Sequence, residues 1–163
     1  MDYIIRKIRK DDAYDVIHVV TISWNETYKG IVPDDFLELL KHNEQERVEK
    51  FHANFSEDTY VLEVDNKVVG FAKYGTADSE EFPNTGELKA LYIINKYQKY
   101  GYGRMLVDKV KETLKSMGYN KMIITCLKGN PSNEFYKHVG GVYIKDGLYK
   151  KLNLKENIYL FNI

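Results

Sequence analysis

The residues best suited to chemistry lie in one short segment, Gln98-Lys99-Tyr100-Gly101-Tyr102-Gly103, between a predicted strand and a predicted helix. Backbone N–H groups at a helix N-terminus are unpaired and carry the positive end of the helix dipole, so they attract phosphate oxygens. The glycines let a ligand approach the backbone without a Cβ in the way. The same pattern also fits a plain strand-to-helix turn, and the residues alone leave both interpretations open.

Two common phosphate-binding loops do not match this segment. A Walker loop requires Gly-Lys followed by Ser or Thr, whereas Gly103 is followed by Arg104 and Met105. A dinucleotide-binding turn requires a third glycine, but Leu106 stands at that position. A domain that uses the glycine turn for ATP or a flavin stays open as a less favoured alternative.

The elements that must position this segment follow from the hydrophobic pattern. Runs rich in β-branched residues predict strands, and apolar residues at a spacing of three to four predict helices. The predicted strands span 3–9, 59–64, 67–74, 87–94 and 121–127, with two more from Val142 onward, and the predicted helices begin near Asp12, Asp34, Gly103 and Ser132. This order, β-α-α-β-β-β-α-β-α-β-β, predicts an α/β fold. We expect a mixed seven-stranded sheet flanked by about four helices.

Three local details can be predicted within this order. Asp11 or Asp12 is expected to cap the first helix, since a short carboxylate accepts hydrogen bonds from the first-turn N–H groups. The second helix is expected to break around His42-Asn43. Asp65-Asn66 is expected to form a hairpin turn because both residue types tolerate positive φ.

Composition narrows the class of protein. The 163 residues contain 24 basic and 24 acidic side chains, which disfavours a global attraction to nucleic acid or to anionic lipid. One cysteine, Cys126, excludes an intramolecular disulfide and makes a cysteine-rich metal site implausible. No apolar run approaches the length of a membrane span, and residues 1–12 lack a signal-peptide core. We therefore expect one cytoplasmic domain over residues 1–163, with no metal, nucleic-acid or membrane partner.

The glycine segment and the strand before it carry a family resemblance. Gln98-x-x-Gly101-x-Gly103 resembles the pyrophosphate-binding motif of the GCN5-related N-acetyltransferase (GNAT) family, Arg/Gln-x-x-Gly-x-Gly/Ala. The preceding Leu91-Tyr92-Ile93 is similar to the Leu-Tyr-Val of that family's fourth strand. The order of elements also matches the family over nearly the whole chain.

A second block about thirty residues later agrees with the first. Asn130-Pro131, Phe135-Tyr136 and Gly140-Gly141 resemble a subfamily form written Asn-Pro-x-x-x-Phe-Tyr-x-x-x-Gly-Gly. The segment from Trp24 to Pro33 resembles the same subfamily. Three blocks in register make the resemblance far more specific than the glycine turn alone.

The resemblance implies acetyl transfer from acetyl-CoA to a primary amine, by direct attack in a ternary complex. The backbone of Leu91 and Ile93 is then expected to face the pantetheine arm, with the Ile93 N–H donating to the acetyl carbonyl. The backbone amides expected to hold the pyrophosphate belong to Gln98, Lys99, Tyr100, Gly101, Tyr102, Gly103 and Arg104.

Two residues of the second block have expected roles at the cofactor. By resemblance, Tyr136 lies near the CoA sulfur, and a phenol with a pKa of about 10 can protonate a departing thiolate. The alternative is ordinary aromatic packing of the short helix. Asn130 is expected to hydrogen-bond the pantetheine, and it can also cap the helix that Pro131 opens.

The general base and the acceptor pocket are less well defined. Glu87 is the candidate base, because some family members use a carboxylate on this strand, although Glu87 and Lys89 share a strand face and can form a solvated ion pair. Trp24 and Tyr28 are candidates for the wall of the acceptor pocket, since their rings combine apolar area with polar tips. Core packing explains Trp24 equally well.

The expected partner is a small-molecule amine or a peptide amine, whose identity the sequence does not specify. The strands from Val142 onward can pair or exchange between two copies, so a homodimer stays open. The main alternative function is a catalytically silent CoA-binding or regulatory module with the same fold.

Overall fold

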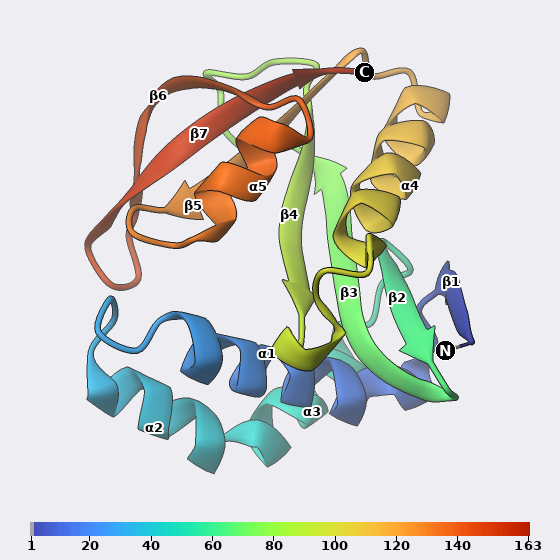
Figure 1. Ribbon diagram of the computed structural model, residues 1–163, viewed down its shortest axis with the longest axis vertical. Helices are drawn as coiled ribbons and strands as arrows, with labels where there is room; N and C mark the ends of the chain where they lie inside the picture. Colours follow the sequence, from blue (N-terminus) through green and yellow to red (C-terminus); the bar gives the residue numbers. More distant parts are fainter. Residues whose placement is uncertain (1) are drawn as a thin grey trace. The chain divides into compact units, whose positions relative to one another are not determined.

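The elements of the computed structural model, which describes residues 2–163, follow the predicted order (Figure 1). The strands are β1 Tyr3–Lys7, β2 Thr59–Val64, β3 Lys67–Thr76, β4 Gly86–Ile93, β5 Lys121–Leu127, β6 Val142–Tyr149 and β7 Leu154–Asn162. The helices are α1 Ala13–Thr27, α2 Asp34–His42, α3 Glu44–Ala53, α4 Tyr102–Ser116 and α5 Ser132–His138, with short 3-10 turns η1 Lys10–Asp12 and η2 Asn95–Tyr97.

The strands form a mixed sheet in the order β1-β2-β3-β4-β5-β7-β6. β4 and β5 run parallel and are joined through α4, whereas β5 pairs with β7 and β7 with β6 antiparallel. The predicted seven-stranded mixed sheet is therefore confirmed. The described chain has five α-helices instead of about four, because the predicted break at Asn43 separates α2 from α3.

The chain divides into two compact units. The first takes the chain up to Lys73 together with Ala90–Leu106, and the second takes Tyr74–Lys89 with Val107–Ile163. Strands β3 and β4 and helix α4 contribute residues to both units.

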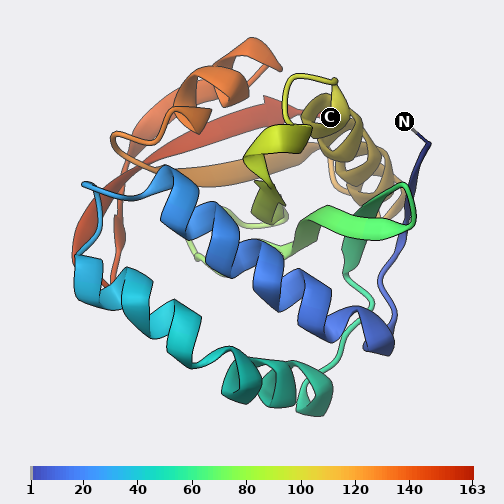
Figure 2. The same ribbon diagram turned by 60° about the horizontal axis from the view of Figure 1, so that its bottom comes forward.

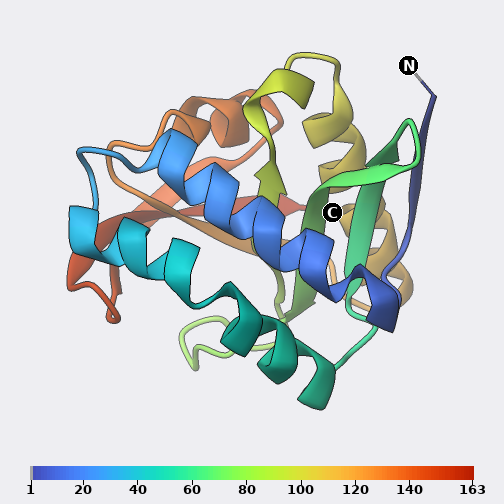
Figure 3. The ribbon, with the colours of Figure 1, turned by 90° about the horizontal axis from the view of Figure 1, so that it is seen from below.

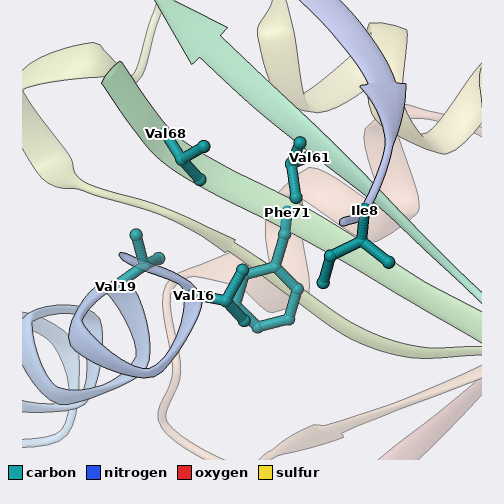
Figure 4. Packing of buried hydrophobic residues seen from close by; sticks show 6 residues of the cluster. All are labelled: Ile8, Val16, Val19, Val61, Val68 and Phe71. Carbon is teal, nitrogen blue, oxygen red and sulfur yellow. The ribbon is translucent and has the colours of Figure 1, made fainter. Parts of the chain in front are cut away.

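The core of the first unit lies between α1 and the strands β2 and β3. Its buried members come from both layers and are Ile8, Val16, Val19, Val61, Val68 and Phe71 (Figure 4). α1 also packs against α2 and α3, which run beside it (Figure 2), and Phe51 of α3 packs against the same cluster. Apolar burial of this kind contributes about 25 cal/mol per Å² and fixes α1 against the sheet.

Asp12 does not cap α1 as expected. Its carboxylate accepts the Arg9 N–H at 2.7 Å and two hydrogen bonds from the Arg6 guanidinium at 2.8 and 2.9 Å. Burial acts to raise the pKa of Asp12, but the bonds from Arg6 and Arg9 outweigh it and hold the pKa below its usual value. The planar guanidinium of Arg6 satisfies both oxygens at once, which the helix N–H groups do not. The predicted hairpin turn is confirmed, with φ of 48° at Asp65 and 67° at Asn66.

In the second unit, α5 and the C-terminal part of α4, from Val107 onward, pack with the strands β5 and β7. Met122, Ile124, Tyr159 and Phe161 are almost completely buried there. Gly141 is required at the start of β6, because a Cβ would lie 2.7 Å from Phe161 Cζ and 2.8 Å from the Tyr136 carbonyl oxygen. The Gly140-Gly141 pair thus lets the chain leave α5 directly against the core.

Candidate functional site

The glycine segment forms a turn with two left-handed residues immediately before α4. φ is 69° at Lys99 and 85° at Gly101, and α4 begins at Tyr102. A turn that passes through the left-handed region can direct successive backbone N–H groups toward one side, where they can donate hydrogen bonds to an anion. Glycine suits position 101 for this reason, whereas Lys99 adopts the same region at a steric cost.

The side chain of Gln98 ties this turn to the end of β4. Its Nε2 donates to the Ile93 carbonyl oxygen at 2.8 Å. The Asn95 N–H donates to Glu26 of α1 at 3.1 Å, so α1 holds the same connection. Gln98 therefore contributes by fixing the path of the chain between β4 and α4, a role that its side chain can fill without a positive charge.

The C-terminal half of β4 carries two of the predicted backbone donors. The Ile94 N–H donates to the Val69 oxygen of β3 at 3.1 Å. Because successive N–H groups of an extended chain point to opposite sides, the N–H groups of Ile93 and Leu91 point away from β3. Within residues 2–163, the pairing of β4 with β5 comprises Gly86 with Met122 and Glu87 with Ile123.

Trp24 and Tyr28 belong to an aromatic group in the first unit. Their ring centroids lie 4.3 Å apart, and Trp24 also meets Phe36 at 5.5 Å. The Trp24 Nε1–H donates to the Tyr92 hydroxyl at 2.9 Å. Trp24 and Tyr28 are both more than nine-tenths buried, as core packing of Trp24 predicts. Sequence reasoning missed Phe36 and the hydroxyl of Tyr92, although Tyr92 lies within the Leu-Tyr-Ile match.

In the second unit, Asn130 lies in the turn just before α5 and Tyr136 lies within α5. The Asn130 Oδ1 accepts the Ser132 N–H at 2.8 Å, so the helix-start role proposed for this residue is present. Tyr136 is 6% exposed, and its ring lies 5.5 Å from Phe135 and 6.3 Å from Tyr159. Rings held in this way keep the Tyr136 phenol in one orientation.

Asn133 anchors the turn between β5 and α5, and sequence reasoning missed it. Its Nδ2 donates to the carbonyl oxygens of Leu127 at 2.9 Å and Asn130 at 2.8 Å. Its Oδ1 accepts the Tyr159 hydroxyl at 2.7 Å and the Asn157 amide at 2.9 Å. Since Asn133 lies one turn before Tyr136, this buried network positions the proposed acid.

Glu87 lies half-buried on β4 among other charged groups of the second unit. Burial raises its pKa; Lys89 acts in the opposite direction, and Asp78 and Glu156 reinforce the increase. The alternative, an ion pair between Glu87 and Lys89, is not found among the described residues, where the Lys89 Nζ lies 3.4 Å from an Asp78 oxygen. Burial also raises the pKa of Glu156, against an opposing hydrogen bond from Thr125. Glu156 is far from Glu87 in the sequence and belongs to no recognised motif, so nothing in the sequence indicated that the two carboxylates interact.

Two further groups of observations concern other chemistry. Cys126 is buried, and burial raises its pKa to about 12, so its thiol stays protonated and unreactive at neutral pH. Across the described part of the chain, no three His, Cys, Asp or Glu side chains are grouped closely enough to hold a metal ion. Over the same residues, no helix has the length and apolarity needed to cross a membrane.

A family model for the "Acetyltransferase (GNAT) family" matches residues 8–140 of this chain. The protein belongs to the GNAT family. It is therefore an acetyl-CoA-dependent acyltransferase. An uncharacterized N-acetyltransferase of Bacillus subtilis strain 168, YuaI, is 33% identical over 134 residues, covering 82% of this chain and 76% of the relative.

Solved structures of this GNAT protein's neighbours share its fold at low sequence identity. The PaiA N-acetyltransferase of Thermoplasma acidophilum, solved in complex with coenzyme A, has a TM-score of 0.79 at 20% identity, with all of both chains covered. A GCN5-related N-acetyltransferase of Rhodopseudomonas palustris has a TM-score of 0.79 at 16% identity, covering 100% of this chain and 97% of that one. At these identities the likeness extends to the fold alone.

Proposed function

We propose that this protein transfers an acetyl group from acetyl-CoA to a primary amine by direct attack in a ternary complex. The observation that carries the proposal is the turn before α4, with Lys99 and Gly101 both in the left-handed region and Gln98 bound back to Ile93. That geometry suits a pyrophosphate, whose oxygens accept from the backbone amides of residues 98–104. We infer further that residues 1–163 act as one acetyltransferase domain.

The pantetheine arm is assigned to the backbone of Leu91 and Ile93. Their N–H groups point away from β3, and the pairing of β4 with β5 stops at Glu87, which supports a ligand bound along the strand. The Ile93 N–H is the proposed donor to the acetyl carbonyl oxygen, which becomes an oxyanion when the amine attacks. Losing one such donor typically costs about 2.7–4 kcal/mol of barrier.

Tyr136 is the proposed general acid and Glu87 the proposed general base. When the tetrahedral intermediate collapses and its C–S bond breaks, the departing CoA thiolate takes the proton of the Tyr136 phenol, a group whose ordinary pKa of about 10 lies near that of a thiol. The raised pKa of Glu87 brings a carboxylate closer to neutral pH, where a base operates best. Asn130 is assigned to the pantetheine by its place in the second block, at the turn where its Oδ1 accepts the Ser132 N–H.

Trp24 and Tyr28 are assigned to the wall of the acceptor pocket. Their packed, nearly buried rings supply the rigid apolar surface that an aliphatic amine requires. The Asn-Pro…Phe-Tyr…Gly-Gly subfamily, a cytoplasmic location and pairing of the last strands in a homodimer stay predictions from the sequence.

The test compares acetyl-CoA consumption over a panel of amines for the wild type and Tyr136→Phe. We expect kcat to fall about 10²–10⁴-fold, the usual contribution of a general acid, with CoA affinity unchanged. Tyr143→Phe is the matched control, since its hydroxyl is on exposed β6 and bonds Asp146 at 2.6 Å. An unchanged kcat in Tyr136→Phe would refute the acid, and tight CoA binding without turnover on any amine would favour the silent module.

A further inference from the structure

A pocket of about 470 Å³ lies on the first unit, between α1 and the junction of α2 with α3. The α1 residues that line it are His18, Thr21, Ile22, Asn25 and Glu26. They recur at a spacing of three to four and therefore form one stripe of the helix. Lys41 of α2 and Glu44 of α3 complete the lining, and Figure 3 shows these two helices running beside α1. None of these residues is assigned to the substrate or cofactor of the proposed acetyl transfer, and Glu26 alone touches the connection after β4, through the Asn95 N–H.

Partly buried hydrogen bonds hold the three helices around this pocket. The Arg47 guanidinium donates to the Thr21 Oγ1 at 2.6 Å, to the Leu40 carbonyl oxygen at 2.7 Å and to the Asn43 Oδ1 at 2.8 Å. The Asn25 Nδ2 donates to the Thr21 carbonyl oxygen of its own helix at 2.9 Å. The same Nδ2 also lies 3.4 Å from the Leu37 carbonyl oxygen of α2, so α1 is tied to α2 through Asn25 and to the α2–α3 junction through Arg47.

The charges around the pocket leave it net negative. The Lys41 ammonium is already paired with Glu38 at 3.0 Å. The Arg47 guanidinium donates to neutral oxygens, although its charge also acts on Glu44. The Glu44 carboxylate meets His18 Nδ1 at 2.9 Å. The Glu26 carboxylate accepts the Asn95 N–H at 3.1 Å and forms no ion pair with any cation among residues 2–163. Glu26 is thus a carboxylate on the pocket wall that lacks a counter-charge.

We propose that this pocket binds the ammonium group of a small aliphatic amine. The carboxylates of Glu26 and Glu44 accept its N–H groups in charge-assisted hydrogen bonds, and Ile22 packs against its carbon chain. The volume lies within the range of small-molecule sites. An anionic ligand would meet two carboxylates, whereas the positive groups nearby are already occupied. This site is additional to the acceptor position proposed for acetyl transfer.

The test follows butylamine binding by NMR titration of the ¹⁵N-labelled full chain. The probes are the side-chain amide of Asn25, which lines the pocket, and the backbone amide of Asn95, which donates to the lining residue Glu26. Butanol and butyrate, which match butylamine in length, are the neutral and anionic comparisons. We expect saturable shifts of both probes with butylamine and not with the other two compounds.

Charge-neutral variants then assign the shifts to this pocket. Glu26→Gln and Glu44→Gln retain an oxygen that accepts from Asn95 and from His18, so the fold is preserved while the charge is lost. Each is expected to weaken butylamine binding about tenfold or more, the effect of losing one charge-assisted bond. Glu38→Gln is the control, because Glu38 is an exposed α2 carboxylate outside the lining.

The inference is overturned if Glu26→Gln binds butylamine as tightly as the wild type. It is also overturned if butanol or butyrate shifts the two probes equally. Because the readout is binding and not turnover, these outcomes are independent of whether the proposed acetyl transfer is correct.

Discussion

Asn133→Ala removes the side chain that joins α5, β5 and β7 through four hydrogen bonds. Each such bond contributes about 1 kcal/mol net, so the free energy of unfolding is expected to fall by about 4 kcal/mol. The Tyr159 hydroxyl is a large part of this loss, because Tyr159 is 1% exposed and water does not replace its partner.

The assay is urea unfolding followed by circular dichroism, with the midpoint compared at constant slope. Glu134→Ala is the matched control on the same helix turn, since the Glu134 side chain is 82% exposed and pairs only with Lys137 among the ion pairs of the described residues. We expect it to change stability by less than about 0.5 kcal/mol. A loss below about 1.5 kcal/mol in Asn133→Ala would contradict the view that this network holds α5 in place.

Two further predictions concern Gly101, in the turn before α4, and Glu87, the proposed base. Gly101→Ala introduces a Cβ that meets nothing within 4 Å, so its cost is the strain of φ +85°, about 1–2 kcal/mol. It should also weaken CoA binding in a thermal-shift titration, whereas the control Gly118→Ala, at φ +99°, should lose only stability. Burial and nearby carboxylates raise the pKa of Glu87 in the folded chain, so its contribution to stability falls as pH rises from about 4.3 through the folded pKa. Glu87→Gln should therefore be more stable than the wild type at pH 7 but not below pH 4, as urea unfolding at both pH values will show.

Local backbone preferences explain what could be predicted about the fold. The left-handed turn at Asp65-Asn66 and the break between α2 and α3 depend on residues adjacent in sequence. The turn before α4 belongs to the same class, because glycine at position 101 and the start of a helix are both local signals. Asp12 shows the limit of this reasoning. A local rule predicts that its carboxylate caps α1, but the carboxylate instead accepts hydrogen bonds from the Arg6 guanidinium and the Arg9 N–H.

The sequence by itself determined the order of elements, the glycine turn before α4 and the membership of the GNAT family. Only the tertiary structure decided which distant side chains meet: Asn133 with Tyr159, Lys89 with Asp78, and the stripe of α1 with Glu44 across the pocket. The physical reason is that a turn depends on the dihedral preferences of a few neighbouring residues, whereas a partner depends on the path of the whole intervening chain. The pKa of Glu87 is raised mainly by burial, and this burial exists only once the chain has folded.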